Sequence, residues 1–236
     1  MVINKNYIYN TTELMELILK NNPKYKTSSL YNKIKEMEDN GEIVRIGKSQ
    51  YVFKTLRLFD YELESVVAKK VDKVIRNNYS NDLECAIYET TTVLNQFLNH
   101  LINRNVVIVE IPKIFINHVF NTLKENGLKN VLCNPSQDDV FRYVDDSTII
   151  LLPLVSKSPI DRKNRRTTIE KITVDIVCSS VLNCFYEGAE LSEMVKDILS
   201  NYRVRFDTLK NYAKRRNALD KLAKYIPKTI EALFND

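Results

Sequence analysis

Closely spaced carboxylates are the residues of this chain that could support metal-dependent chemistry. Asp138 and Asp139 are adjacent, as are Asp145 and Asp146, and Glu110 lies near the end of an apolar run just before a proline. Two carboxylates on one face could hold Mg²⁺ against phosphate oxygens. Adjacent residues on a strand point to opposite faces, and aspartate favours turns. We therefore interpret both pairs as turn residues and Glu110 as a charge at a strand end.

Other catalytic and metal-binding signatures are missing from the sequence. There is no GxxxxGK loop and no dinucleotide fingerprint. A nucleotidyltransferase would present a Gly-Ser turn followed by Asp-x-Asp, and neither occurs. The four cysteines have no CxxC spacing, and His100 and His118 have no serine or cysteine partner nearby. We therefore predict no catalytic residue, no metal and no cofactor.

One pair of oppositely charged residues has a spacing that would place both side chains on the same face of a helix. Lys171 and Asp175 are four residues apart in a segment with a helical apolar stripe. Such residues share a helix face, where an ion pair contributes about 0.3–0.5 kcal/mol. The alternative is that Lys171 reaches a phosphate beside the basic loop 162–166.

The net charge of +5 is distributed unevenly along the chain. Residues 157–171 hold six Lys/Arg against two Asp/Glu, and residues 202–228 hold nine against two. Local basic clusters suggest anion-binding faces, although solvated helix surfaces produce the same pattern. The candidate phosphate or nucleic-acid surface consists of Arg162, Lys163, Arg165, Arg166, Lys171, Lys210, Lys214, Arg215 and Arg216.

Residues 1–55 contain the helices and strands that would position a first group of candidate binding residues. Helical and alternating apolar patterns follow one another there, separated by Asn, Pro and Gly. The expected elements are a β-like run at 7–9, a helix capped by Thr11 or Thr12, a second helix at 28–39 capped by Thr27 and stopped by Asn40 and Gly41, and hairpin strands at 43–46 and 50–53.

Two helices followed by a basic-tipped hairpin predict a winged helix-turn-helix. An apolar stripe of Leu30, Ile34 and Met37 would dock the second helix on the core and turn its polar face outward. Asparagine can pair with adenine, and Ser, Tyr, Lys and Arg can contact phosphates or base edges. The predicted DNA-binding residues are Ser28, Ser29, Tyr31, Asn32, Lys35, Arg45 and Lys48. A winged helix used for protein contacts is the alternative, because acidic residues crowd the end of the second helix.

Residues 56–236 predict a second, α/β domain with a mixed sheet, flanking helices and a helical C-terminal portion. The expected helices are 62–76, a helix from Thr91 or Thr92 to Leu101, a helix opened by Pro112, and helices at 169–182, 191–202 and 206–225. The expected strands are 85–88, 106–111, 130–133, and a hairpin of 138–143 with 148–155. The fold class is therefore α+β or α/β.

No apolar run approaches the ~18 residues of a membrane span. The first six residues lack the apolar core of a signal peptide. We therefore predict a cytoplasmic protein with no membrane partner.

Four segments together carry a family resemblance. They are the winged-helix segment, the strand-to-helix step from Tyr88 to Phe97, the helix containing Glu170, Lys171 and Asp175, and the helix from Tyr212 to Arg216. In this order they resemble the AbiEi-type antitoxins of abortive-infection (type IV) toxin–antitoxin systems. The resemblance spans nearly the whole chain and departs from the family at the N-terminal strand.

The resemblance implies a phage-defence antitoxin with a nucleotidyltransferase-like domain over 56–236 that has lost catalysis. Such a protein binds double-stranded DNA at its own operator and represses its operon, with a homodimer expected on an inverted repeat. It counteracts a nucleotidyltransferase toxin encoded beside it without a stable complex. Two alternatives from other classes remain: an active nucleotide- or phosphoryl-transfer enzyme that uses the carboxylates, and a protein-binding adaptor.

Overall fold

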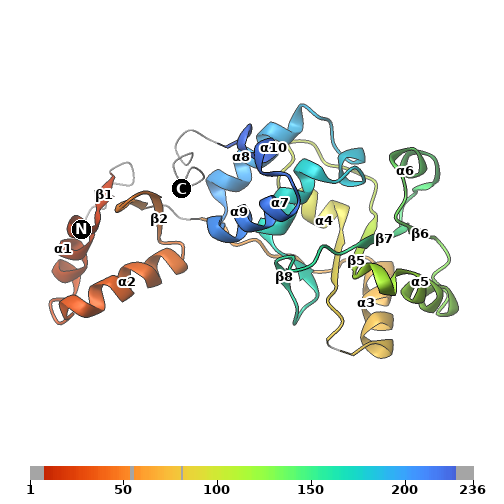
Figure 1. The fold of residues 1–236 in the computed structure, drawn as a ribbon, viewed down its shortest axis with the longest axis horizontal. Helices are drawn as coiled ribbons and strands as arrows, with labels where there is room; N and C mark the ends of the chain where they lie inside the picture. The colour runs from red at the N-terminus through yellow and green to blue at the C-terminus, as the bar shows by residue number, and fades with distance from the viewer. Residues whose placement is uncertain (1–7, 54–55, 81, 227–236) are drawn as a thin grey trace. The chain divides into compact units, whose positions relative to one another are not determined.

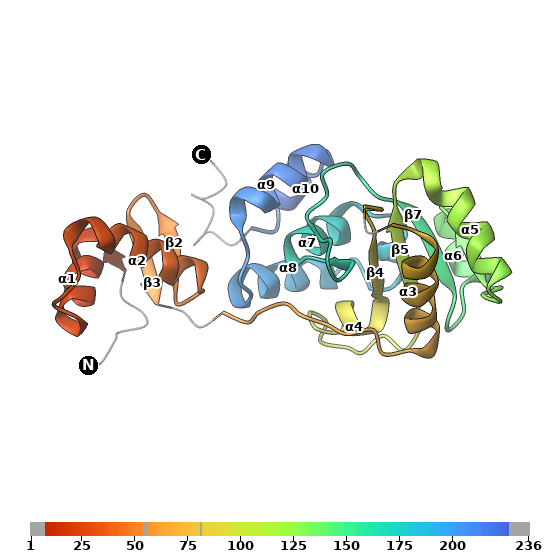
Figure 2. The same ribbon diagram turned by 90° about the horizontal axis from the view of Figure 1, so that it is seen from below.

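The computed structural model describes residues 8–53, 56–80 and 82–226, and it is a mixed α/β protein (Figures 1 and 2). The chain divides into two compact units. The first includes the residues up to Leu58 together with Leu199–Arg203, and the second includes Phe59–Ile198 and Val204–Tyr225. Among the described residues, no helix is long and apolar enough to cross a membrane.

The first unit combines two helices with a three-stranded antiparallel sheet. The sheet order is β1-β3-β2, so the third strand lies between the other two. The elements are β1 (Tyr9–Asn10), α1 (Thr11–Asn21), α2 (Thr27–Asp39), β2 (Ile43–Gly47) and β3 (Gln50–Phe53). Both predicted helices and both hairpin strands are confirmed, while Tyr7 lies outside the described residues.

The predicted helix caps in this unit were wrong by one or two residues. Asn10 rather than Thr11 or Thr12 caps α1: its side-chain oxygen accepts a hydrogen bond from the Glu13 amide at 2.9 Å, and the Glu13 carboxylate accepts from the Asn10 amide at 2.7 Å. This reciprocal capping box satisfies the backbone donors of Asn10 and Glu13, and neither threonine is followed three residues later by a Glu or Gln that could form one. Thr27 is the first residue of α2 rather than its cap.

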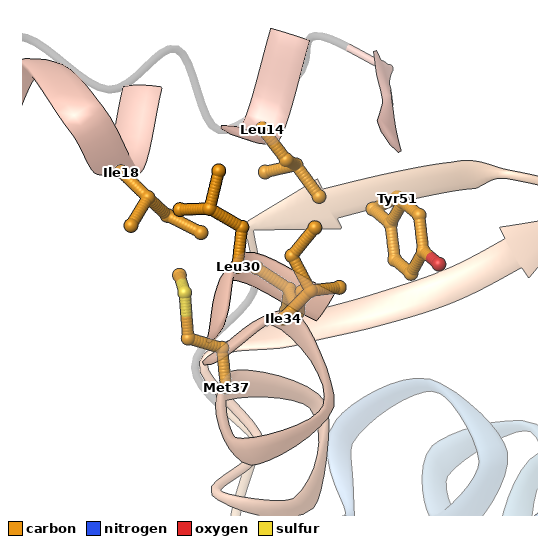
Figure 3. Close-up of a cluster of buried hydrophobic side chains, with 7 residues drawn as sticks. Leu14, Ile18, Leu30, Ile34, Met37 and Tyr51 are labelled. Carbon is orange, nitrogen blue, oxygen red and sulfur yellow. The ribbon is translucent and has the colours of Figure 1, made fainter. Parts of the chain in front are cut away.

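The core of the first unit is small and formed by α1, α2 and the sheet (Figure 3). Its buried side chains are Leu14, Ile18, Leu30, Ile34, Met37, Ile43 and Tyr51. The predicted stripe of α2 supplies three of these residues, so the opposite face of that helix turns outward. Gly41, with φ at +66°, ends the helix in the left-handed region that favours glycine.

The second unit is built on a four-stranded mixed sheet with the order β4-β5-β7-β6. The first pair of strands is antiparallel, and the other pairs are parallel. The strands are β4 (Ala86–Glu89), β5 (Val107–Ile111), β6 (Val131–Cys133) and β7 (Ile149–Pro153). Every residue of β4 and β5 is buried, as expected for strands covered on both faces.

Helices cover both sides of this sheet. In both views α3 and α5 lie on one side of the strands, and α7, α9 and α10 lie on the other (Figures 1 and 2). The helices are α3 (Val66–Asn78), α4 (Thr90–Leu94), α5 (Ile116–Glu125), α6 (Gln137–Tyr143), α7 (Ile169–Cys178), α8 (Glu190–Asn201), α9 (Phe206–Arg215) and α10 (Leu219–Ala223). Two single 3₁₀ turns, η1 (Lys113–Phe115) and η2 (Leu182–Cys184), and a small ladder of β8 (Ile160–Asp161) with β9 (Arg166–Thr167) complete the described part.

The predicted hairpin of 138–143 with 148–155 was wrong. Residues 137–143 form helix α6, and β7 pairs in parallel with β5 and β6. Ser136 caps α6 through a capping box with Asp139, and Asp138 adds a second negative charge to its first turn. Carboxylates in a first turn favour the helix, so this acidic pair is helical and is not part of a turn. Asp145 and Asp146 do lie in the connection before β7.

Four predicted helices had the wrong limits. Helix α3 begins four residues late, because Ser65 caps it by accepting a hydrogen bond from the Ala68 amide at 3.0 Å, and Val66 is 83% exposed. Helix α4 ends at Leu94, and Leu101 is exposed. The expected helix 206–225 is two helices, because Asn217 adopts a φ of +50° between α9 and α10. The expected helix 169–182 ends at Cys178.

We predict that Ile34→Ala destabilises the first unit. The change empties a fully packed position between α1, α2 and the sheet, which typically costs about 2–5 kcal/mol of unfolding free energy. Urea unfolding, followed by amide hydrogen exchange of α2, measures the loss. The exposed neighbour Lys35→Ala is the control and should change stability by less than about 0.5 kcal/mol. Equal effects of the two changes would contradict this core assignment.

Candidate functional site

A buried cluster of charged side chains lies in the second unit. Lys171, on α7, is 1% exposed, and Glu110 and Asp175 beside it are also buried. The Lys171 ammonium forms ion pairs with the Asp175 carboxylate at 2.5 Å and with the Glu110 carboxylate. One cation from a helix therefore joins an acid of its own helix to an acid of strand β5.

Three further side chains contact the two carboxylates, two through hydrogen bonds and one through an ion pair. The Tyr88 hydroxyl, from β4, donates to Glu110 at 3.1 Å. The Tyr212 hydroxyl, from α9, donates to Asp175 at 3.0 Å. Arg216, at the end of α9, places its Nε 3.3 Å from the same Asp175 oxygen, Oδ1. The cluster thus ties β4, β5, α7 and α9 together.

The electrostatics of the cluster determine what Lys171 can do. Burial opposes the charge of its ammonium, but the carboxylates of Asp175 and Glu110 outweigh burial and raise the pKa of Lys171. Burial also raises the pKa of Glu110, and the Lys171 charge offsets part of that rise. Because Lys171 is protonated at neutral pH, it can donate hydrogen bonds or bind an anion. It cannot act as a nucleophile or a general base there.

The cluster faces a cavity at one edge of the sheet. The cavity has a volume of about 170 Å³ and is lined by Glu110, Leu152 and Asn134, at or just after the carboxyl ends of β5, β7 and β6. Its other charged lining residues are Lys171, Asp175 and Arg216. The crevice outside the carboxyl ends of parallel strands is the usual ligand position in open α/β sheets. This cavity is therefore the candidate small-ligand site of the second unit.

The sequence predicted the ion pair of Lys171 with Asp175 correctly but missed its setting. The pair is buried, so Lys171 does not belong to an exposed basic surface with the loop 162–166. Sequence reasoning assigned Glu110 to a strand end and did not connect it with Lys171. One signal was available: the apolar residues of α7 occupy most directions around the helix and not only a narrow stripe, which indicates a largely buried helix.

The predicted basic surface is only partly a surface. Arg165 is 2% exposed and buried, which contradicts its place in that set. Arg162 is exposed and forms an ion pair with Glu84, and the Arg166 guanidinium lies over the Tyr61 ring. Of the remaining members, Lys163 is exposed, Lys210 is half-buried, and Arg216 joins the buried cluster.

Two basic residues of α9 remain on the surface together. Lys214 and Arg215 are exposed and line a second, shallower hollow with Lys157. Thr208 and Asn211 line the same hollow. Three cations with no carboxylate among the lining residues make this hollow a basic part of the surface of the second unit.

The predicted DNA-binding residues of the first unit lie on its surface. On α2, Ser28, Asn32 and Lys35 are exposed, Tyr31 is 63% exposed and Ser29 is half-buried. Arg45 and Lys48, on and next to the hairpin strands, are exposed. The outer face of α2 is therefore polar and accessible, as the helical spacing predicted.

Comparison with known proteins places this two-unit α/β protein in a family. The chain belongs to the DUF6577 family, a family of unknown function whose model matches residues 29–232. The match includes all six charged and aromatic members of the buried cluster. No curated protein and no solved structure gives a significant match to the chain.

We predict that Lys171→Met strongly destabilises the second unit. Removing the ammonium leaves two buried carboxylates without their shared partner, which costs about 3–5 kcal/mol of unfolding free energy. Urea unfolding at pH 7 measures the loss. Lys196→Met is the matched control, because Lys196 forms an exposed ion pair with Glu193 that should contribute less than about 1 kcal/mol. Similar losses in both variants would refute the structural role of the cluster.

The Lys171→Met loss should depend on pH. In this variant, burial and the neighbouring carboxylate raise the folded-state pKa of Glu110 above the unfolded value, and no Lys171 charge offsets that rise. The folded variant then binds more protons than the unfolded chain, so its stability falls as pH rises from the unfolded carboxylate pKa through the raised pKa. The difference between variant and wild type should therefore be smaller at pH 5 than at pH 8, and a constant difference would contradict this.

Proposed function

We propose that the chain is a DNA-binding transcriptional repressor that acts as the antitoxin of a type IV toxin–antitoxin pair. The observation that carries the DNA-binding part is the accessible polar face of α2. Leu30, Ile34 and Met37 fix this helix on the core, and Asn32 and Lys35 point away from it.

The dimensions and side chains of α2 suit the major groove. Its 13 residues span about 20 Å at 1.5 Å per residue, and a recognition helix contacts base edges with its N-terminal part. Ser28, Tyr31 and Asn32 lie in that part. The Asn32 amide can donate to and accept from adenine, while Lys35 supplies charge to the phosphates.

The order of elements in the first unit supports a winged helix-turn-helix. A strand, two helices and an antiparallel hairpin follow one another, and the hairpin returns through Lys48 and Ser49. Arg45 and Lys48 give this hairpin a basic edge that can contact the DNA backbone or minor groove. Helix and hairpin would then grip DNA at two adjacent places.

The antitoxin part of the proposal rests on the resemblance to AbiEi-type proteins. In the second unit the resembling residues Glu170, Lys171 and Asp175 are buried, which favours a structural role for that motif. We propose a nucleotidyltransferase-like unit without transferase activity, because the Gly-Ser and Asp-x-Asp motifs that would hold metal and nucleotide are missing from the sequence. It would counteract a nucleotidyltransferase toxin without forming a stable complex, in the cytoplasm.

We predict that Asn32→Ala combined with Lys48→Ala abolishes specific operator binding. The double change removes one base contact, worth about 1–3 kcal/mol of discrimination, and one phosphate contact. Fluorescence anisotropy of the full chain with about 100 base pairs of its own upstream DNA, with scrambled competitor and at two salt concentrations, measures the affinity. Wild-type binding should survive the competitor and weaken with salt.

Two controls make this test specific. Lys20→Ala removes one positive charge from α1 and should leave operator affinity nearly unchanged. Circular dichroism should show that the double variant remains folded. Unchanged operator affinity in the double variant would contradict the assignment of α2 and the hairpin as the DNA-binding face. A wild-type chain that binds DNA only non-specifically would favour the protein-binding adaptor.

We also predict that DNA binding and toxin neutralisation are separable. Asn32 and Lys48 lie in the first unit, and the proposed antitoxin activity resides in the second. Cells that express the neighbouring toxin gene together with the Asn32→Ala, Lys48→Ala chain should therefore grow as well as cells with the wild-type chain, while a reporter behind the operator loses repression. Survival lost together with repression would contradict this division.

A further inference from the structure

The cavity beside Lys171 contains more hydrogen-bond donors than the protein itself satisfies. An ammonium group has three N–H bonds, and within the described residues Lys171 uses two of them, toward Glu110 and Asp175. The group is 1% exposed, so bulk solvent does not readily supply the third acceptor. A buried donor without an acceptor is destabilising, and more so when it is charged.

Arg216 provides a second cation at the same cavity, where its guanidinium interacts with the Cys178 thiol and keeps further N–H donors. Its Nε is buried and has no well-aligned hydrogen-bond acceptor among the described residues, although the Asp175 carboxylate lies 3.3 Å away. Its side chain is 25% exposed, so the guanidinium lies between the buried cluster and the outside. A guanidinium in this position can present a pair of N–H groups to one planar or tetrahedral oxyanion.

The rim of the cavity adds a neutral donor on an unusual backbone. Asn134 directly follows β6 and has a φ of +42°, in the left-handed region. Its amide N–H donates to the Leu151 carbonyl of β7 at 2.8 Å, which fixes the backbone there. Its side-chain amide has no hydrogen-bond partner in the described part of the chain and lines the cavity. Non-glycine residues held in this region cluster at ligand sites.

Size and charge limit what the cavity can hold. Its volume of about 170 Å³ exceeds the ~10–15 Å³ that one water needs but falls below the ~300–1,000 Å³ of drug-sized pockets. Two cations and two carboxylates balance within the cluster, so a ligand with several separate anionic groups would add more negative charge than the cluster compensates. A ligand with a single oxyanion group in the cavity fits both limits.

We propose that this cavity binds the carboxylate or phosphate group of a small molecule. Arg216 and Lys171 donate to its oxygens, and Asn134 donates at the rim. The two carboxylates hold the cations in place and do not contact the ligand anion. The site is independent of the proposed DNA-binding face, because every one of its residues belongs to the second unit.

The experiment is a titration of the full chain, labelled with ¹⁵N in arginine, with sodium phosphate and separately with sodium acetate. Sodium chloride at the same ionic strength is the reference. The Arg216 Nε–H resonance, assigned by its loss in Arg216→Lys, should move in a saturable way with at least one of the two anions and stay fixed in chloride. The anion with the higher affinity identifies phosphate or carboxylate as the ligand group.

Two variants on the same helix test the assignment to the cavity. Arg216→Gln should weaken binding about tenfold or more, since a charged hydrogen bond contributes about 1.5–3 kcal/mol. In that variant, the backbone amides of Ser179 and Ser180, which also line the cavity, report binding in a uniformly labelled sample. Arg215→Gln removes the same charge from outside the cavity and should leave the affinity within twofold.

Three results would overturn the proposal. The first is the absence of a saturable shift with either anion, which would mean that water alone fills the cavity. The second is equal affinity in Arg216→Gln and wild type. The third is equal weakening by Arg215→Gln and Arg216→Gln, which would indicate general attraction of anions to a basic surface.

Discussion

The second unit depends on one ammonium group held between two carboxylates. Lys171, on α7, forms ion pairs with Glu110 of β5 and with Asp175 of its own helix. Asp175 in turn contacts Tyr212 and Arg216, which links α7 to α9. Isolated buried charges are expensive, and a shared cation compensates for them only where the geometry is well matched. The relative positions of the central strand and two helices are therefore constrained by charge as well as by apolar packing.

A second buried carboxylate shows why this cluster differs from an ordinary structural charge. Glu89, at the end of β4, is fully buried and accepts hydrogen bonds from the amides of Glu64 and Ser65 and from the Asn105 side chain. Neutral donors satisfy Glu89 and leave it closed to ligands. The cluster around Lys171 instead retains donors toward a cavity. Glu89 and Glu110 therefore have different consequences, although both are buried carboxylates of the same sheet.

The sequence predicts those parts of the structure that depend on interactions between residues close together along the chain. The helices and hairpin of the first unit and the strands 107–111 and 149–153 follow from local periodicity and were predicted. The capping box of Ser136 with Asp139 was readable from the sequence but was interpreted as a turn. Glu110 and Lys171 are 61 positions apart, so no local pattern connects them, and only the tertiary packing of α7 beside β5 brings them together.

The two units therefore differ in how securely sequence can assign their chemistry. The polar face of α2 is set by a single helical repeat, since fixing Leu30, Ile34 and Met37 inward forces Asn32 outward. The cavity needs residues from β5, β7, α7 and α9 and from the segment just after β6 at the same time. A substitution in any one of these elements can alter it without changing a recognisable motif. Residues such as Arg216, which look like ordinary helix-surface charges in the sequence, acquire their chemical meaning only from the fold.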